Sequence, residues 1–149
     1  MMRVRIGAVA AALVAVGALA PSASAGVTPV VHPRAPQAAG CRGASCAGRN
    51  PHTTKCDRGA GTLDRVRSDG GGPVVQLRVS AACSAAWAYV PKGFDGYRFK
   101  IQVQRGATYV ESASFARVAY TPMVWSSDRY RACVEDYGSG GDWACTVWH

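Results

Sequence analysis

Cysteine and histidine are the first side chains in this sequence to consider as metal ligands or catalytic groups. The chain has 149 residues, with six cysteines and three histidines. Four of these residues lie close together in the sequence: Cys41, Cys46, His52 and Cys56. Their C-x4-C-x9-C spacing matches no established zinc pattern. We therefore expect no metal site and no cofactor.

A catalytic set is not evident either. No G-x-S-x-G motif marks a serine nucleophile. The three histidines, His32, His52 and His149, are far apart, and the sequence shows no His–carboxylate or Cys–His arrangement. The stretch from Gly138 to Gly141 is similar to the loop around a serine-protease nucleophile, but Gly-Ser-Gly-Gly is also ordinary turn composition. The sequence therefore predicts a protein without enzymatic activity.

The N-terminal segment has the three parts of a secretory signal peptide. Arg3 and Arg5 give a positive start, Ile6 to Ala20 is an apolar run, and Ala23-Ser24-Ala25 is a cleavage site of small residues. The apolar run is shorter than the ~20 residues of a membrane-spanning helix. We expect residues 1–25 to be removed, no membrane span in the mature chain, and a secreted, extracellular product.

Export to an oxidising compartment predicts that the six cysteines form disulfides. The sequence leaves their pairing open, with one favoured pair. Cys133 and Cys145 lie on the two arms of a predicted hairpin, and closing that loop stabilises the fold by ~3 kcal/mol in a chain-entropy model. At least one bridge should tie the N-terminal loop to Cys83. The four cysteines outside the favoured pair are Cys41, Cys46, Cys56 and Cys83, and their pairing is left open.

Residues 26–40 are rich in proline and alanine and predict a flexible leader, which leaves residues 41–149 as a single domain. Within the domain, apolar and polar residues alternate most clearly at 75–79 and 97–104, as in half-buried antiparallel strands. Weaker strands are predicted at 109–113 and 117–125, where Pro122 marks an edge or a bend. Residues 131–137 and 143–148 form the two arms of the predicted hairpin across a glycine-rich turn.

The remaining segments complete the expected fold. Residues 41–63 have almost no aliphatic side chains, so this loop must be held by its disulfides. Residues 81–89 favour a hairpin return, with Trp87 buried in the core, over a helical turn. The sequence therefore predicts an all-β domain, a small antiparallel sandwich or barrel with a disulfide-held N-terminal loop. We expect a monomer.

The net charge of +8 would draw the protein to polyanions in general. The basic residues are spread along the chain without a Lys/Arg block, so no specific nucleic-acid partner is expected. Alternation directs the polar residues of the two clearest strands outward. If these strands are neighbours, Arg78, Arg98 and Lys100 would line one basic face.

Aromatic residues towards the C-terminus suggest a platform for a sugar or a protein. Its candidates include Tyr130, whereas Trp143 and Trp148 are expected to pack on the last disulfide. The basic strand residues and the C-terminal aromatic region together define a candidate binding surface. Its six residues are Arg78, Arg98, Lys100, Trp125, Arg129 and Arg131.

Five short motifs span much of the domain: C-R-G-A-S-C-A-G at 41–48, V-Q-L-R-V-S at 75–80, A-A-W-A at 85–88, Y-T-P-M at 120–123 and R-A-C at 131–133. Through them the chain resembles the actinobacterial domain-of-unknown-function 2690 family. It departs from the family's pattern at Asn50, Gln76 and Ala81, where Asp, Glu and Pro are usual. The resemblance implies an extracytoplasmic domain, found alone or beyond a membrane protein with a cytoplasmic helix-turn-helix, and brings no known activity.

Export, basic charge and the missing catalytic set predict a secreted, non-catalytic domain that binds a cell-envelope or extracellular macromolecule. One alternative is an exported protease inhibitor, in which the loop between Cys133 and Cys145, or between Cys46 and Cys56, enters the protease. Another is a small secreted hydrolase or antimicrobial effector, for which the sequence offers the least support.

Overall fold

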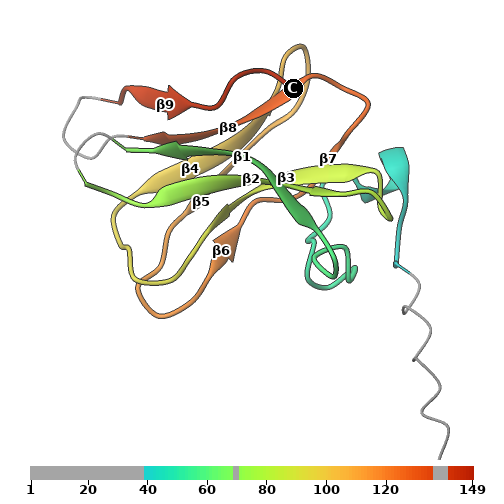
Figure 1. The fold of residues 1–149 in the computed structure, drawn as a ribbon, viewed down its shortest axis with the longest axis horizontal. Coiled ribbons are helices and arrows are strands. Elements are labelled where there is room, and N and C mark those ends of the chain that lie inside the picture. Colours follow the sequence, from blue (N-terminus) through green and yellow to red (C-terminus); the bar gives the residue numbers. More distant parts are fainter. Residues whose placement is uncertain (1–38, 69–70, 136–140) are drawn as a thin grey trace, which may run out of the picture. The chain divides into compact units, whose positions relative to one another are not determined.

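The computed structural model describes residues 39–68, 71–135 and 141–149 (Figure 1). The predicted signal peptide, most of the predicted leader, and residues 138–140 of the predicted turn lie outside these ranges. The described residues contain one short 3-10 helix, η1 (Gly43–Cys46), and nine β-strands. None of their helices has the length and apolarity to cross a bilayer.

Five strands form the first sheet: β1 (Gly61–Arg67), β2 (Val74–Ser80), β3 (Ala85–Val90), β6 (Ala119–Tyr120) and β7 (Val124–Trp125). β1, β2 and β3 are antiparallel neighbours in that order, and both β6 and β7 pair with β3. Pro122 separates β6 from β7, because proline has no N–H to donate to a ladder. The prediction that residues 81–89 return as a hairpin is confirmed.

Four strands form the second sheet in the order β5 (Thr108–Ser112), β4 (Arg98–Val103), β8 (Tyr130–Glu135) and β9 (Trp143–Cys145). All its pairings are antiparallel. The register places Cys133 directly opposite Cys145, and the two are bonded, which is the pair that the hairpin spacing favours. The disulfide therefore clamps the last two strands.

The inner faces of the two sheets form the main hydrophobic core (Figure 1). Alternation along β4 buries Phe99 and Ile101 completely, while Arg98 and Lys100 lie on the outer face. Val75, Leu77 and Val90 meet them from the first sheet. The all-β prediction is confirmed, and the architecture is a sandwich, because two separate sheets pack through their apolar faces.

β1 is a strand that the sequence pattern missed. Its half-buried positions are Thr62, Asp64 and Val66, and only the last is apolar. Leu63, the most apolar residue nearby, is 49% exposed. Apolar periodicity does not reveal this strand, because Val66 is its one half-buried apolar residue and the register shift between Thr62 and Asp64 interrupts the alternation. β1 forms because its backbone pairs with β2.

A second buried cluster covers the opposite face of the first sheet. Alternation along β3 directs Ala86 and Ala88 into the sandwich and Trp87 to this other face. Trp87 is 2% exposed, so it is buried as predicted, but against the N-terminal loop. Its fully or nearly buried neighbours in the cluster are Cys46, Cys56, Cys83, Ala85 and Met123.

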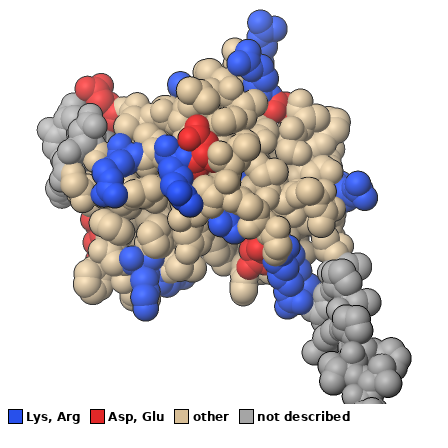
Figure 2. Space-filling model, viewed as in Figure 1, with Lys and Arg blue, Asp and Glu red and all other residues tan. Residues whose placement is uncertain are grey.

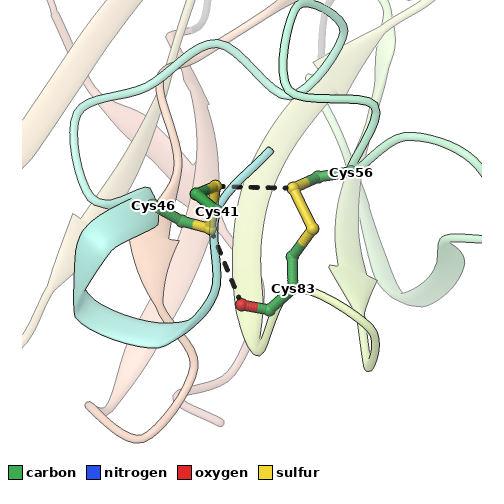
Figure 3. Close-up of side chains that lie close together, drawn as sticks. All are labelled: Cys41, Cys46, Cys56 and Cys83. Carbon is green, nitrogen blue, oxygen red and sulfur yellow. Dashed lines mark hydrogen bonds between the residues drawn. A yellow bond between two sulfur atoms is a disulfide. The ribbon is translucent and has the colours of Figure 1, made fainter. Parts of the chain in front are cut away.

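Two disulfides hold the N-terminal loop on this cluster, side by side in Figure 3. Cys41 is bonded to Cys46, and Cys56 is bonded to Cys83 in the turn between β2 and β3. The second bond is the tether to the sheet that the sequence required. The Sγ atoms of Cys41 and Cys56 are 3.7 Å apart, and since disulfide sulfurs carry no proton, this is a van der Waals contact. Packed sulfur thus replaces the aliphatic side chains that the loop lacks.

Candidate functional site

The residues of the candidate binding surface lie in different parts of the domain. Arg78 is on β2 of the first sheet, whereas Arg98 and Lys100 are on β4 of the second. The two strands are not neighbours, so the single basic face does not form. Arg98 instead pairs with Glu135, its Nη1 3.2 Å from the Oε2 atom. Figure 2 shows lysine and arginine scattered over the face in view.

Cations on the outer face of the second sheet are covered by indole rings. Lys100 Nζ lies 3.9 Å from the ring centroid of Trp143, and the Arg131 guanidinium carbon lies 4.4 Å from that of Trp148. Burial lowers the pKa of Lys100, and the charge of Arg131 lowers it further. The two tryptophans, expected on the disulfide, therefore contribute cation–π contacts that stabilise this face.

Tyr130 does not belong to a surface platform. Its side chain is 5% exposed and packs in the sandwich core. Burial raises the pKa of its hydroxyl, because the charged phenolate is disfavoured away from water. Its position at the start of β8 directs it inward, which the sequence pattern had not shown.

A cleft of about 580 Å³ brings Trp125 and Arg129 together. We call it the Trp125 cleft. Trp125 is 41% exposed, and Asp128 and Arg129 add charges of opposite sign to the lining. The other lining residues are Ala44, Ala47, Val103, Gln104, Arg105, Gly106, Ala107, Tyr109 and Val124. An exposed indole in a largely apolar concavity has the composition of a ligand site.

Two glycines of the disulfide loop let it approach the aromatic side chains of the cleft. Gly43 and Gly48 have φ angles of +60° and +74°, which other residues rarely adopt. A Cβ atom at Gly43 would lie 3.4 Å from Nε1 of Trp125, and one at Gly48 would lie 3.3 Å from the Tyr109 hydroxyl. Backbone hydrogen bonds of 2.7 and 2.9 Å join the same glycines to the β2–β3 turn and to the segment before β7. One side of the cleft thus depends on the disulfide-held loop.

Two histidines pair with aspartates, so the expectation of no His–carboxylate arrangement was wrong. His52 Nδ1 lies 2.7 Å from Asp57 Oδ2, and His149 Nε2 lies 3.0 Å from Asp64 Oδ2. The second pair joins residues 85 positions apart, which only the folded chain brings together. Within the described residues, neither imidazole hydrogen-bonds to a serine, threonine or cysteine, so neither pair has the nucleophile of a triad.

Acid should weaken the pair formed by Asp64 and His149. The hydrogen bond from His149 holds the pKa of Asp64 below its ordinary value, so the stabilisation is present above the unfolded-state pKa and is lost as the pH falls through the folded one. We expect Asp64→Asn to reduce stability at pH 6 by about 0.5–1 kcal/mol. Urea unfolding at a series of pH values should show the difference shrinking below pH ~4. Parallel curves for the two proteins would contradict this assignment.

The sulfur atoms nearest to a metal-site geometry are all engaged in disulfides. The Sγ atoms of four cysteines all lie within 4.8 Å of one another. These are Cys41, Cys46, Cys56 and Cys83, which form two disulfides. A thiolate must be free to bind a metal, and none of these is free. His52, weighed from the sequence as a further ligand, pairs with Asp57.

The segment between Cys46 and Cys56, one of the two predicted inhibitory loops, is wound into turns. Asn50 Oδ1 accepts hydrogen bonds from the backbone N–H groups of His52 and Thr53, at 2.9 and 3.1 Å. The Cys56 N–H donates to the Pro51 carbonyl at 2.8 Å. An inhibitory loop that pairs with a strand edge of the protease must be extended. This segment is not extended. The loop between Cys133 and Cys145 lies partly outside the described residues.

The fold and the site define a small all-β domain of two antiparallel sheets, cross-linked by three disulfides and carrying an aromatic surface cleft. The chain belongs to the family described as "Protein of unknown function (DUF2690)", whose model matches residues 44–134. The family resemblance of the motifs is thereby confirmed, and the match includes both Arg78 and Trp125. No curated protein and no solved structure matches the chain.

Proposed function

We propose that this protein is an exported, non-catalytic binding domain whose partner is a macromolecule of the cell envelope or the extracellular space. Its three disulfides fit an oxidising compartment, and its N-terminal sequence has the pattern of a signal peptide. The family description names no activity. The proposal therefore depends on the chemistry of the surface.

Trp125 in its cleft is the observation that carries the proposal. Tryptophan is highly buried on average, yet this side chain is 41% exposed and lines a concavity together with Tyr109. Aromatic side chains in such pockets supply much of the binding energy in protein interfaces. Arg129 and Asp128 provide polar groups that could orient a partner. The disulfide-held loop forms one wall of the cleft, and a preformed wall limits the entropic cost of association.

Replacing Trp125 with alanine should abolish most of this binding. We expect the affinity to fall by roughly thirtyfold or more, because an interface hot spot contributes about 2 kcal/mol or more. The measurement is retention of the oxidised protein on purified cell wall and on immobilised secreted proteins, at low and high salt. Phe115→Ala is the matched control, since Phe115 is 69% exposed and does not line the cleft.

Two outcomes would count against the proposal. If the wild-type protein is not retained on either material at low salt, binding to the envelope or to a secreted protein is excluded under those conditions. If Trp125→Ala is retained as well as the wild type, the cleft is not the binding site. Loss of binding in Phe115→Ala alone would move the site to another surface.

A further inference from the structure

A second cavity, of about 520 Å³, lies over the outer face of the first sheet. We call it the Arg78 pocket. The strand register builds it: Arg78 on β2 stands opposite Trp87 on β3, and Gln76 stands opposite Tyr89. Tyr89 in turn stands opposite Tyr120 on β6. Residues paired in this way direct their side chains to the same face, and all five line the cavity.

The guanidinium of Arg78 is fixed by neutral groups. Its Nη2 donates to the Ala60 carbonyl at 2.6 Å, and its Nη1 donates to Thr62 Oγ1 at 2.9 Å. Gln76 Oε1 lies 3.5 Å from the same Nη1, and the guanidinium carbon is 5.9 Å from the centroid of the Tyr89 ring. None of these groups is charged. Nothing in residues 39–68, 71–135 or 141–149 forms an ion pair with Arg78.

Part of this guanidinium is available to a ligand. Its Nε makes no hydrogen bond within the described residues, and those residues contain no buried side-chain nitrogen or oxygen that lacks a partner. The Nε atom must therefore be accessible to solvent. Arg78 itself is only half-buried and lines the cavity. A positioned cation without a counter-ion, in a concave site, is suited to bind an anion.

The walls of the pocket suit a ring. Tyr89 and Tyr120 give it two partly exposed aromatic side chains, beside the nearly buried Trp87. The hydroxyls of the two tyrosines make no hydrogen bond within the part of the chain that the structure describes. His52 Nδ1 pairs with Asp57, which leaves the other ring nitrogen free for a polar ligand group. Asp57 is the one carboxylate in the lining, and its Oδ2 atom is hydrogen-bonded to His52. Aromatic faces combined with several polar groups are typical of sites for polar rings.

We propose that the Arg78 pocket binds an acidic sugar, with the carboxylate on Arg78 and the sugar ring against the aromatic side chains. The volume is within the range of about 300–1,000 Å³ that is usual for small-molecule sites. An arginine fork matches the two oxygens of a carboxylate and cannot lose its charge near neutral pH. This inference is independent of the Trp125 cleft, because the two cavities share no lining residue.

The direct test is a titration of the oxidised protein with two carboxylate-bearing sugars and their neutral counterparts, at physiological salt. The probes are glucuronate against glucose and N-acetylmuramate against N-acetylglucosamine, with acetate as the carboxylate alone. Trp87 lines the pocket, so tryptophan fluorescence and amide chemical shifts on β2 and β3 report binding. We expect at least one acidic sugar to bind roughly tenfold or more tightly than both its neutral counterpart and acetate.

Gln76→Glu is the most informative variant, because it changes a charge and almost no volume. Its carboxylate would stand where the Gln76 amide now lies 3.5 Å from Arg78, and would neutralise the guanidinium from within the protein. We expect it to lower the affinity for the acidic sugar by roughly tenfold or more while the fold is retained. Arg78→Met should have at least as large an effect, and Arg78→Lys an intermediate one because it keeps the charge but not the fork. Arg98→Met, on the second sheet, is the control.

The proposal is overturned if neither acidic sugar binds, if a neutral sugar or acetate binds equally well, or if Gln76→Glu binds like the wild type. Circular dichroism of each variant guards against misfolding, and Gln76→Glu decides the matter if Arg78→Met does not fold. Trp125→Ala should bind the acidic sugar normally. If the acidic sugar does not bind, the proposal for the Trp125 cleft is unaffected. If Trp125→Ala binds the envelope partner like the wild type, the proposal for the Arg78 pocket is unaffected.

Discussion

Removal of the disulfide between Cys56 and Cys83, by alanine at both positions, is expected to lower the free energy of unfolding by about 4 kcal/mol. The two cysteines are 27 positions apart, so the bond restricts a long segment of the unfolded chain. It is also the covalent link between the N-terminal loop and the first sheet. Urea unfolding of the oxidised double variant measures the loss, and limited proteolysis should cut first within residues 39–60.

The bond between Cys41 and Cys46 is the matched control for this experiment. Its partners are only 5 positions apart, and the same chain-entropy argument gives about 2 kcal/mol for its removal. If the two double variants lose equal stability, loop length is not what decides the contribution of these bonds. Resistance of residues 39–60 to proteolysis in the variant without Cys56 and Cys83 would show that packing alone holds the loop.

Trp87→Ala is expected to lower the free energy of unfolding by roughly 3–5 kcal/mol, the usual cost of truncating a buried tryptophan. The side chain is 2% exposed and joins the first sheet to the disulfide cluster. Its removal leaves a cavity against disulfides that cannot move inward. Chemical denaturation followed by far-ultraviolet circular dichroism provides the measurement, with the midpoint shifted and the slope unchanged.

Trp125→Ala provides the same substitution at an exposed position. Since Trp125 is 41% exposed, we expect a change within about 1 kcal/mol. Equal losses for the two tryptophan variants would mean that Trp87 is not part of a cooperative core. The comparison also matters for function, because the binding test on the Trp125 cleft is informative only if that variant is folded.

Local sequence patterns were sufficient where one side of an element is apolar. The alternation at 75–79 and 97–104 predicted β2 and β4, and the hairpin spacing favoured the bond between Cys133 and Cys145. The scarcity of aliphatic residues in 41–63 predicted a loop cross-linked by disulfides, and two disulfides lie in it or anchor it. β1 was not predicted, because Val66 is its one half-buried apolar residue and a register shift interrupts its alternation. The strand forms by pairing with β2.

The candidate site was only partly predictable. Aromatic and basic composition towards the C-terminus predicts Trp125 and Arg129 as binding residues, and the two line one cleft. The residues that complete this cleft come from η1 and from the β4–β5 turn. No local sequence pattern predicts that these two segments lie next to each other. The two glycines that allow the approach, Gly43 and Gly48, would have been the available signal, since clustered glycines in a cysteine-rich loop indicate tight turns.

The six cysteines and the alternating pattern by themselves determined that this chain forms a disulfide-stabilised β domain, because redox chemistry and the two-residue period of a strand are local properties. Only the tertiary structure decided which strands share a sheet. That choice separated Arg78 from Arg98 and Lys100, and it gave Arg78 neutral neighbours and an aromatic pocket. It also brought His149 to Asp64 across the chain. Strand order depends on contacts between distant segments, and the two-residue period of a single strand carries no information about them.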